Sequence, residues 1–185
     1  QGMTAATALP EAQFQRAFNT IEQHVEQRYD IPIVITDVVE PFTGDLDGAR
    51  IQVDYDNSAE DALFIIAHLF GHTIQWNLSE SGRTIGNQVP DPNLSEARMQ
   101  ELYQYELDAA RYSLALFHAA GVRTLDQWLS DYFHCDWAYL SHFYKHNEKR
   151  DFRSFWRTGT TKISPLAIPD FRPQSWKTRW AGIVV

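Results

Sequence analysis

Apolar side chains recur every three or four residues in four stretches of the chain, and this spacing predicts four amphipathic helices. The stretches are residues 10–29, 58–77, 95–120 and 124–145. Ser58 is a predicted N-cap of the second helix, because Asp61 follows three residues later in a near capping box. Thr124 and Gln127 form a similar pair before the fourth helix. The third helix should end at Gly121, which suits a left-handed C-cap.

Two shorter stretches alternate or are rich in β-branched residues, which is typical of strands. They are residues 31–38 and 49–55. Residues 40–48 carry turn residues and are predicted to form a loop or hairpin connection, and residues 78–92 are a predicted loop. From residue 158 onward, three prolines indicate an extended tail that wraps the body. The predicted class is α+β, with a small antiparallel or mixed sheet packed on three to four helices. Residues 3–185 form one domain, while Gln1-Gly2 resembles the scar of a removed expression tag.

Composition and charge limit the classes of function that the protein can have. The chain has 185 residues and a formal charge of -8, so it offers no basic face for nucleic-acid backbones. A single cysteine, Cys135, excludes an internal disulfide and suits a reducing compartment; its apolar surroundings favour a packed thiol over a nucleophile. No apolar run approaches the length of about 20 residues that a membrane helix needs. We therefore expect a soluble, cytoplasmic protein that binds neither nucleic acid nor membrane.

The candidate chemistry lies in the second predicted helix. His68 and His72 are four residues apart, so both imidazoles project from one helical face and are placed to share a metal ion. This spacing is close to the zinc-protease pattern H-E-x-x-H, but Leu69 occupies the glutamate position. The alternative is a pair of core histidines that hydrogen-bond to their surroundings.

Two imidazoles bind metal weakly, so a third protein ligand is expected. Glu106 is the candidate, because it lies on the apolar side of the third helix, where an unpaired carboxylate is costly. The small residues Gly71, Ala109 and Ala110 would let the two helices approach closely. The alternative for Glu106 is an ion pair with an arginine such as Arg98 or Arg111.

These residues resemble those of the ImmA/IrrE family of small zincin-like metallopeptidases, the minigluzincins. The family's active helix reads like F-x-x-A-H-E-x-G-H, and residues 64–72 read FIIAHLFGH. Its later helix reads like E-x-E-A-x-x-F-A, and residues 106–113 read ELDAARYS. The resemblance covers residues 31–120 and implies a zincin-like core with His68, His72 and Glu106 as zinc ligands. Residues 121–185 add a helix and a tail outside it.

In that family the glutamate after the first histidine takes a proton from water and passes it to the leaving amine. Such transfer contributes roughly 10²–10⁴-fold to the rate, and Leu69 cannot perform it. Ordinary peptidase activity is therefore doubtful unless another side chain substitutes. The candidates are Glu80, Glu96, Tyr103, Asp108 and Tyr112.

Three functions remain open from the sequence. The first is a metal-dependent hydrolase-like protein that uses zinc, or alternatively iron(II) or manganese, on a peptide or small molecule. The second is an inactive pseudo-protease that acts as a binding or regulatory module. The third is a non-haem iron(II) enzyme with a two-histidine, one-carboxylate centre. A homodimer is compatible with the acidic surface and the aromatic fourth helix.

His142 and His146 repeat the four-residue spacing, which fits a solvated helix end or, alternatively, substrate contact or a second metal site.

Overall fold

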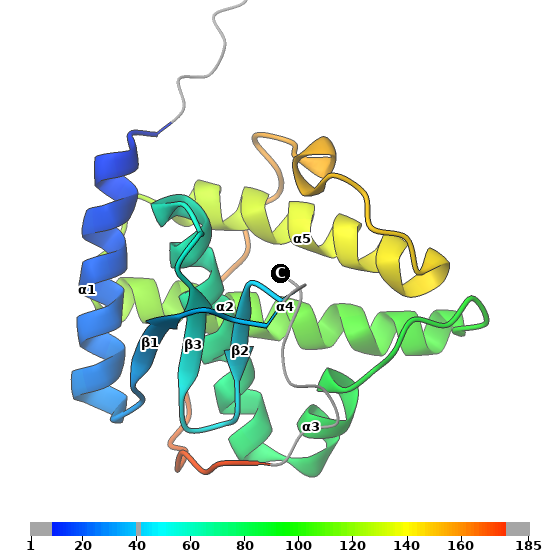
Figure 1. Ribbon diagram of the computed structural model, residues 1–185, viewed down its shortest axis with the longest axis horizontal. Helices are drawn as coiled ribbons and strands as arrows, with labels where there is room; N and C mark the ends of the chain where they lie inside the picture. Colours follow the sequence, from blue (N-terminus) through cyan, green and yellow to red (C-terminus); the bar gives the residue numbers. More distant parts are fainter. Residues whose placement is uncertain (1–8, 40–41, 177–185) are drawn as a thin grey trace, which may run out of the picture.

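The structure, a computed structural model, describes residues 9–39 and 42–176 and has an α+β fold (Figure 1). Its elements are α1 (Glu11–Tyr29), β1 (Ile33–Thr36), β2 (Gly44–Leu46), β3 (Ile51–Asp54), α2 (Ala59–Leu78), α3 (Glu80–Gly86), α4 (Glu96–Ala119), α5 (Asp126–His146) and the 3-10 helix η1 (Phe152–Phe155). The predicted tag scar, Gln1-Gly2, lies outside the described residues. None of the helices in the described ranges is both long and apolar enough to cross a membrane.

The sheet is mixed and has the strand order β1-β3-β2. β1 pairs with β3 in parallel, and β2 pairs with β3 antiparallel, so that Ile51 is the register partner of both Ile33 and Leu46. The strand β2 lies within residues 40–48, where the sequence indicated a loop or hairpin connection, and it pairs antiparallel with β3. Its sequence is only Gly-Asp-Leu, too short for an alternating pattern, and the adjacent β3 holds it in place.

The helices number five among the described residues, rather than the three to four predicted. The additional one is α3, which lies in the predicted loop of residues 78–92. Its sequence is rich in serine and glycine, yet Ser79 caps it by accepting a hydrogen bond from the Gly82 backbone N–H. The predicted Ser58 cap of α2 is confirmed, because its side chain accepts from the Asp61 N–H. The Thr124 cap of α5 is wrong: Leu125 precedes the first turn and makes no side-chain cap.

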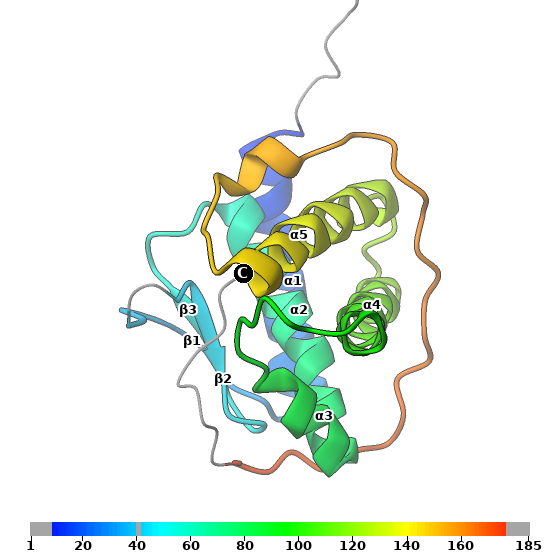
Figure 2. The same cartoon turned by 90° about the vertical axis from the view of Figure 1, so that its right-hand side faces the viewer.

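α2 is the central element of the fold: it lies between the sheet and α4, and α1 packs against it as well (Figures 1 and 2). It crosses α4 with very little space between the backbones. A Cβ atom added at Gly71 would lie 2.3 Å from the Ala109 carbonyl oxygen. In addition, the Ser113 hydroxyl donates a hydrogen bond to the Ala67 carbonyl across this crossing. The predicted close approach of the two helices is therefore present, and it brings their side chains into one small volume.

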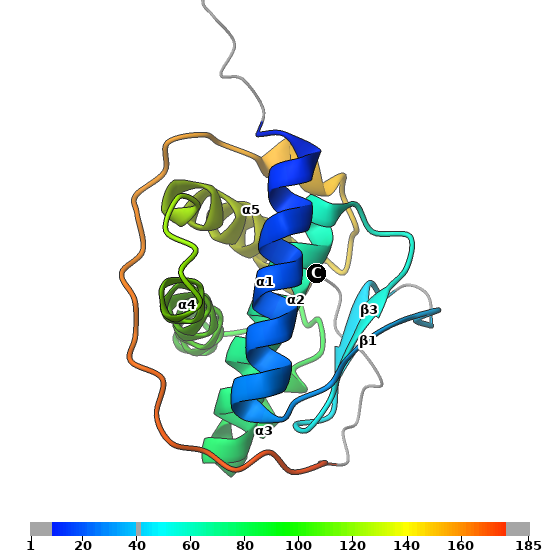
Figure 3. The same ribbon diagram turned by 90° about the vertical axis from the view of Figure 1, so that its left-hand side faces the viewer.

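After η1 the chain forms an extended belt, residues 157–176, that runs around the outside of the helices (Figures 2 and 3). Asp131 on α5 accepts hydrogen bonds from the backbone N–H groups of Gly159 and Thr160. Farther along, the Leu166 N–H donates to the Arg111 carbonyl on α4. The belt ends beside α2, where Asn77 accepts from the Gln174 N–H. Polar contacts to three helices thus hold a segment that has no regular structure of its own.

Candidate metal centre

Three side chains converge at the crossing of α2 and α4. The Nε2 atoms of His68 and His72 lie 2.9 Å apart. The Glu106 Oε2 atom lies 3.0 Å from His68 Nε2 and 3.1 Å from His72 Nε2. One ligand atom from each residue therefore lies close enough to the other two for all three to hold one metal ion.

The three ligand candidates are deeply buried. His68 and His72 are each 1% exposed and Glu106 is 5% exposed. The four-residue spacing on α2 places both imidazoles on the face that meets α4, and Glu106 projects from α4 toward them. Isolated polar groups are costly at such depth, so the cluster needs internal partners or a cation.

The outer nitrogen of His72 is held by a defined hydrogen bond. Gln75 donates through Nε2 to the Tyr105 carbonyl, which leaves its Oε1 atom facing His72 Nδ1 at 2.7 Å. This arrangement assigns the hydrogen of a neutral His72 to Nδ1 and leaves the Nε2 lone pair free for a metal. The Tyr105 ring stacks on His72 with a centroid distance of 4.3 Å and fixes the ring plane.

Counting hydrogens favours a cation over a closed hydrogen-bond network. With both imidazoles neutral, only His68 has a hydrogen to offer on Nε2, and it serves at most two of the three contacts. The contact between His72 Nε2 and Glu106 Oε2 would then join two acceptors. The Nδ1 atom of His68 is buried without a partner among the described residues in either case. A cation at the centre satisfies all three contacts at once.

The pKa shifts fit this reading. Burial, and then the neighbouring His72, lower the pKa of His68, which keeps its imidazole in the neutral form that binds metals. Burial alone would raise the pKa of Glu106, but the adjacent His72 and His68 outweigh it and hold that pKa well below its usual range. Glu106 is thus favoured as an ionised carboxylate, and His68 as a neutral imidazole.

The alternative partners of Glu106 lie elsewhere. Arg98 pairs with Glu101 at 2.8 Å, and Arg111 lies 3.8 Å from Asp108. The ion-pair contacts of Glu106 within the described ranges are those with the two histidines. The interpretation of Glu106 as an arginine partner is therefore wrong.

Asp136 on α5 is a fourth buried polar residue at this centre, and the sequence interpretation missed it. Its Oδ2 atom lies 4.0 Å from His68 Nε2, and neither carboxylate oxygen has a hydrogen-bond partner among the described residues. Burial, and then the charge of Glu106, raise the pKa of Asp136 well above its usual value. A signal was present in the sequence, because Asp136 interrupts the apolar stripe of α5 between Phe133 and Leu140.

Leu69, at the position of the missing glutamate, is fully buried and packs beneath the sheet. A Cβ added at Gly44 of β2 would lie 3.0 Å from Leu69 Cδ1. No hydrogen bond or ion pair in the described ranges links any proposed substitute base to the three-residue cluster. Glu80 and Glu96 are exposed at the starts of α3 and α4, and Asp108 accepts a hydrogen bond from Gln104.

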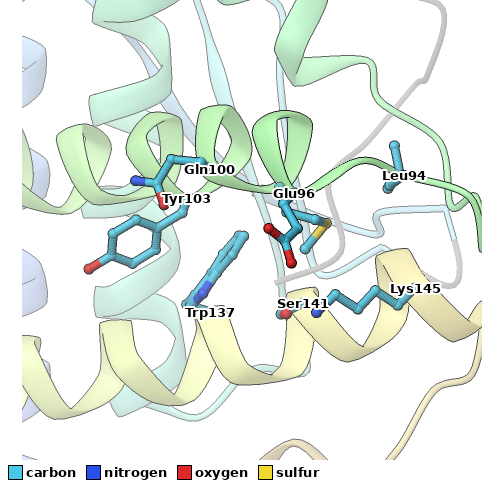
Figure 4. Close-up of a pocket in the computed structure, with 8 residues that line it drawn as sticks. Leu94, Glu96, Gln100, Tyr103, Trp137, Ser141 and Lys145 are labelled. Atoms are coloured by element: carbon cyan, nitrogen blue, oxygen red, sulfur yellow. The ribbon is translucent and has the colours of Figure 1, made fainter.

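The two tyrosine candidates also contact other groups. Tyr112 is buried in the hydrophobic core. Tyr103 packs against Trp137, and both line a groove of about 440 Å³ between α4 and α5 (Figure 4). Glu96 lines the same groove at its other end. Their catalytic roles stay predictions without a contact to support them.

The remaining reactive side chains lie apart from the cluster. Burial raises the pKa of the Cys135 thiol to about 12, which makes it a packed, unreactive group. His142 pairs with Glu148 at 3.2 Å and its ring lies 4.5 Å from that of His146, near the end of α5. This pair has partial contact with solvent and does not join a set of three metal-ligating groups in the described residues.

No protein-family model, no curated protein and no solved structure matches this chain.

Proposed function

We propose that the protein is a metal-dependent, hydrolase-like protein with a zincin-like core. His68, His72 and Glu106 are the proposed ligands. The observation that carries this proposal is the convergence of two imidazole nitrogens and one carboxylate oxygen within 3.1 Å of one another. The hydrogen bond of His72 Nδ1 to Gln75 adds support, since it directs the other nitrogen toward the cluster.

Zinc is the proposed metal because two histidines and a glutamate, with one position left open, are a common catalytic zinc set. A bound ion would polarise a carbonyl or phosphoryl oxygen of a peptide or small-molecule substrate. The chain's own residues supply the rest of the centre. Gln75 and Tyr105 orient His72, Phe64 stacks on His68 at 5.1 Å, and the crossing at Gly71 fixes the distance to Glu106.

A pseudo-protease that binds a partner is the second candidate function. It is favoured by Leu69 and by the depth of the cluster, whose three members are at most 5% exposed. In this case the metal would stabilise the fold and the surface would carry the function. The two candidates make the same prediction about metal binding and differ in whether the wild type hydrolyses any substrate.

Metal content is the first test. The purified protein, depleted of metal and then dialysed against Zn²⁺, Fe²⁺ or Mn²⁺, should retain about one ion per chain. His68→Ala and Glu106→Gln should lose it, while His134→Gln, which changes a histidine outside the cluster, should retain it. Absence of metal from the folded wild type would contradict both candidates. Oxygen consumption after anaerobic iron loading would instead support an iron(II) oxygenase.

Hydrolytic activity is the second test. The zinc-loaded wild type should cleave members of a panel of peptides, esters and phosphoesters, and Glu106→Gln should not. A wild type that holds zinc but cleaves none of them would support the binding module.

A further inference from the structure

The carboxylate of Asp136 is the least explained polar group in the protein. It projects from α5, a helix outside the family resemblance, and its residue is 0% exposed. Neither oxygen has a hydrogen-bond partner in the described residues. A buried carboxylate without partners is costly, so its presence requires either a proton or a positive charge nearby.

A positive charge could lie on the side of Asp136 that faces His68. His68 Nε2 is 4.0 Å from Asp136 Oδ2 and belongs to the proposed metal centre. The like charge of Glu106 repels an ionised Asp136. The other aspartate buried on α5, Asp131, is by contrast fully engaged by Thr160, Gly159 and Gln127. Asp136 therefore lies beside the cluster, and its carboxylate makes no hydrogen bond to any of the described residues.

The distance distinguishes between direct and indirect contact. His68, His72 and Glu106 form the group whose ligand atoms all lie within 4.8 Å of one another, and Asp136 is not part of it. A separation of 4.0 Å from His68 Nε2 is too long for a direct hydrogen bond, so Asp136 would interact with the centre through the ion or through a group bound to it. Asp136 thus lies beside the ligand set without being a member of it.

We propose that Asp136 is the second carboxylate of the metal centre, where it accepts a hydrogen bond from a small ligand bound to the ion. This inference rests on the proposed metal centre. It gives α5 a positioning role next to the metal. The helix that carries the two histidines, α2, has Leu69 in place of the glutamate. The exchangeable ligand that Asp136 would hold is water, or a substrate group with an O–H or N–H to donate.

The test compares Asp136→Asn, which keeps the shape of the side chain, with Asp131→Asn on the same helix. Zn²⁺ affinity is measured by chelator competition, and Co²⁺-substituted protein provides the visible absorption bands of the bound ion. Asp136→Asn should bind Zn²⁺ about tenfold or more weakly and shift the Co²⁺ bands. Asp131→Asn should leave the Zn²⁺ affinity and the Co²⁺ bands unchanged, although it weakens the attachment of the belt to α5. A second variant, Asp136→Ser, should show the same loss if the asparagine variant folds poorly.

Two results would overturn the inference, and they are distinguishable. If the wild type and Asp136→Asn bind Zn²⁺ equally tightly with identical Co²⁺ spectra, Asp136 has no part in the centre, while the metal proposal stands. If the wild type binds neither ion, both the inference and the proposed function fail.

Discussion

The Gln75 side-chain oxygen lies 2.7 Å from His72 Nδ1, while the nitrogen of the same amide donates to the Tyr105 carbonyl. One glutamine thereby connects the backbone of α4 to the orientation of an imidazole on α2. The residue is three positions after His72, so both lie on the same side of the helix.

Removal of this amide should weaken metal binding. In Gln75→Ala, His72 loses the acceptor that fixes its tautomer, so we expect metal affinity to fall about 10- to 100-fold. Isothermal titration or chelator competition with Zn²⁺ measures the change. Gln104→Ala serves as the control, because that glutamine hydrogen-bonds Asp108 rather than a member of the three-residue cluster. Equal affinities of the two variants would contradict the role of Gln75.

A larger residue at the helix crossing should destabilise the whole protein. The added methyl group of Gly71→Ala would meet backbone atoms of Ala109, one of them at 2.3 Å, so α2 and α4 must separate. Overpacking of this kind costs about 1–3 kcal/mol or more of the free energy of unfolding. Urea unfolding of the metal-free protein measures it.

The control for this substitution is Gly121→Ala. Gly121 has a φ of +85°, and no atom of the described residues lies within 4 Å of its added Cβ. The cost of the substitution is therefore limited to the left-handed backbone, about 1–2 kcal/mol. We expect Gly71→Ala to be the more damaging of the two and to lose metal affinity as well. The reverse order would show that the crossing is not tightly packed.

Restoring a glutamate at position 69 tests the missing base. Leu69 is fully buried beneath β2, so Leu69→Glu places a carboxylate in an apolar layer and should lower the melting temperature, whereas Leu69→Met should not. Peptide cleavage by the zinc-loaded variant is measured in parallel, and we expect none. Cleavage that appears only in the glutamate variant would support the pseudo-protease, since the wild type would then lack the base alone.

Asp45 on β2 should make stability depend on pH. Burial raises the pKa of Asp45 from 3.8 to about 6 in the folded protein. Because the folded state holds this proton more tightly than the unfolded state, the contribution of Asp45 to stability is present at low pH and is lost as the pH rises from about 4 to about 6. Asp45→Asn should therefore be more stable than the wild type at neutral pH, by a margin that closes toward pH ~4.

Unfolding by urea at several pH values measures that margin. The asparagine retains an oxygen for the Leu46 N–H, which donates to Asp45 Oδ1 at 2.8 Å. The comparison therefore isolates the charge. A margin that is the same at acidic and neutral pH would contradict the assignment to Asp45.

The sequence predicted much of the scaffold around His68 because its signals are local. The apolar run of α2 and the Ser58 cap act within a few residues, and so does the spacing of the histidines. The position of Glu106 was also predictable, because a carboxylate on an apolar helical face requires a buried partner. Its contacts with both histidines depend on the close crossing of α2 and α4, which the small residues Gly71 and Ala109 predict.

The missing elements depend on contacts distant in sequence. β2 is three residues long and forms because β3 offers a free edge. α3 forms in a polar segment because Ser79 caps it. Asp136 was overlooked because its significance lies in its distance to His68, 68 positions earlier in the sequence, and helical periodicity on α5 does not report that distance.

The two ends of α2 are each tied to remote parts of the chain. At its start, the Ala59 N–H donates to Glu11 on α1 and Arg153 pairs with Asp61. At its other end, Asn77 anchors the belt at Gln174. Because contacts at both ends restrain α2, we expect the two imidazoles to keep their spacing before an ion binds. Metal uptake would then require little ordering of the chain, and its entropic cost should be small compared with that of sites that fold only when the ion binds.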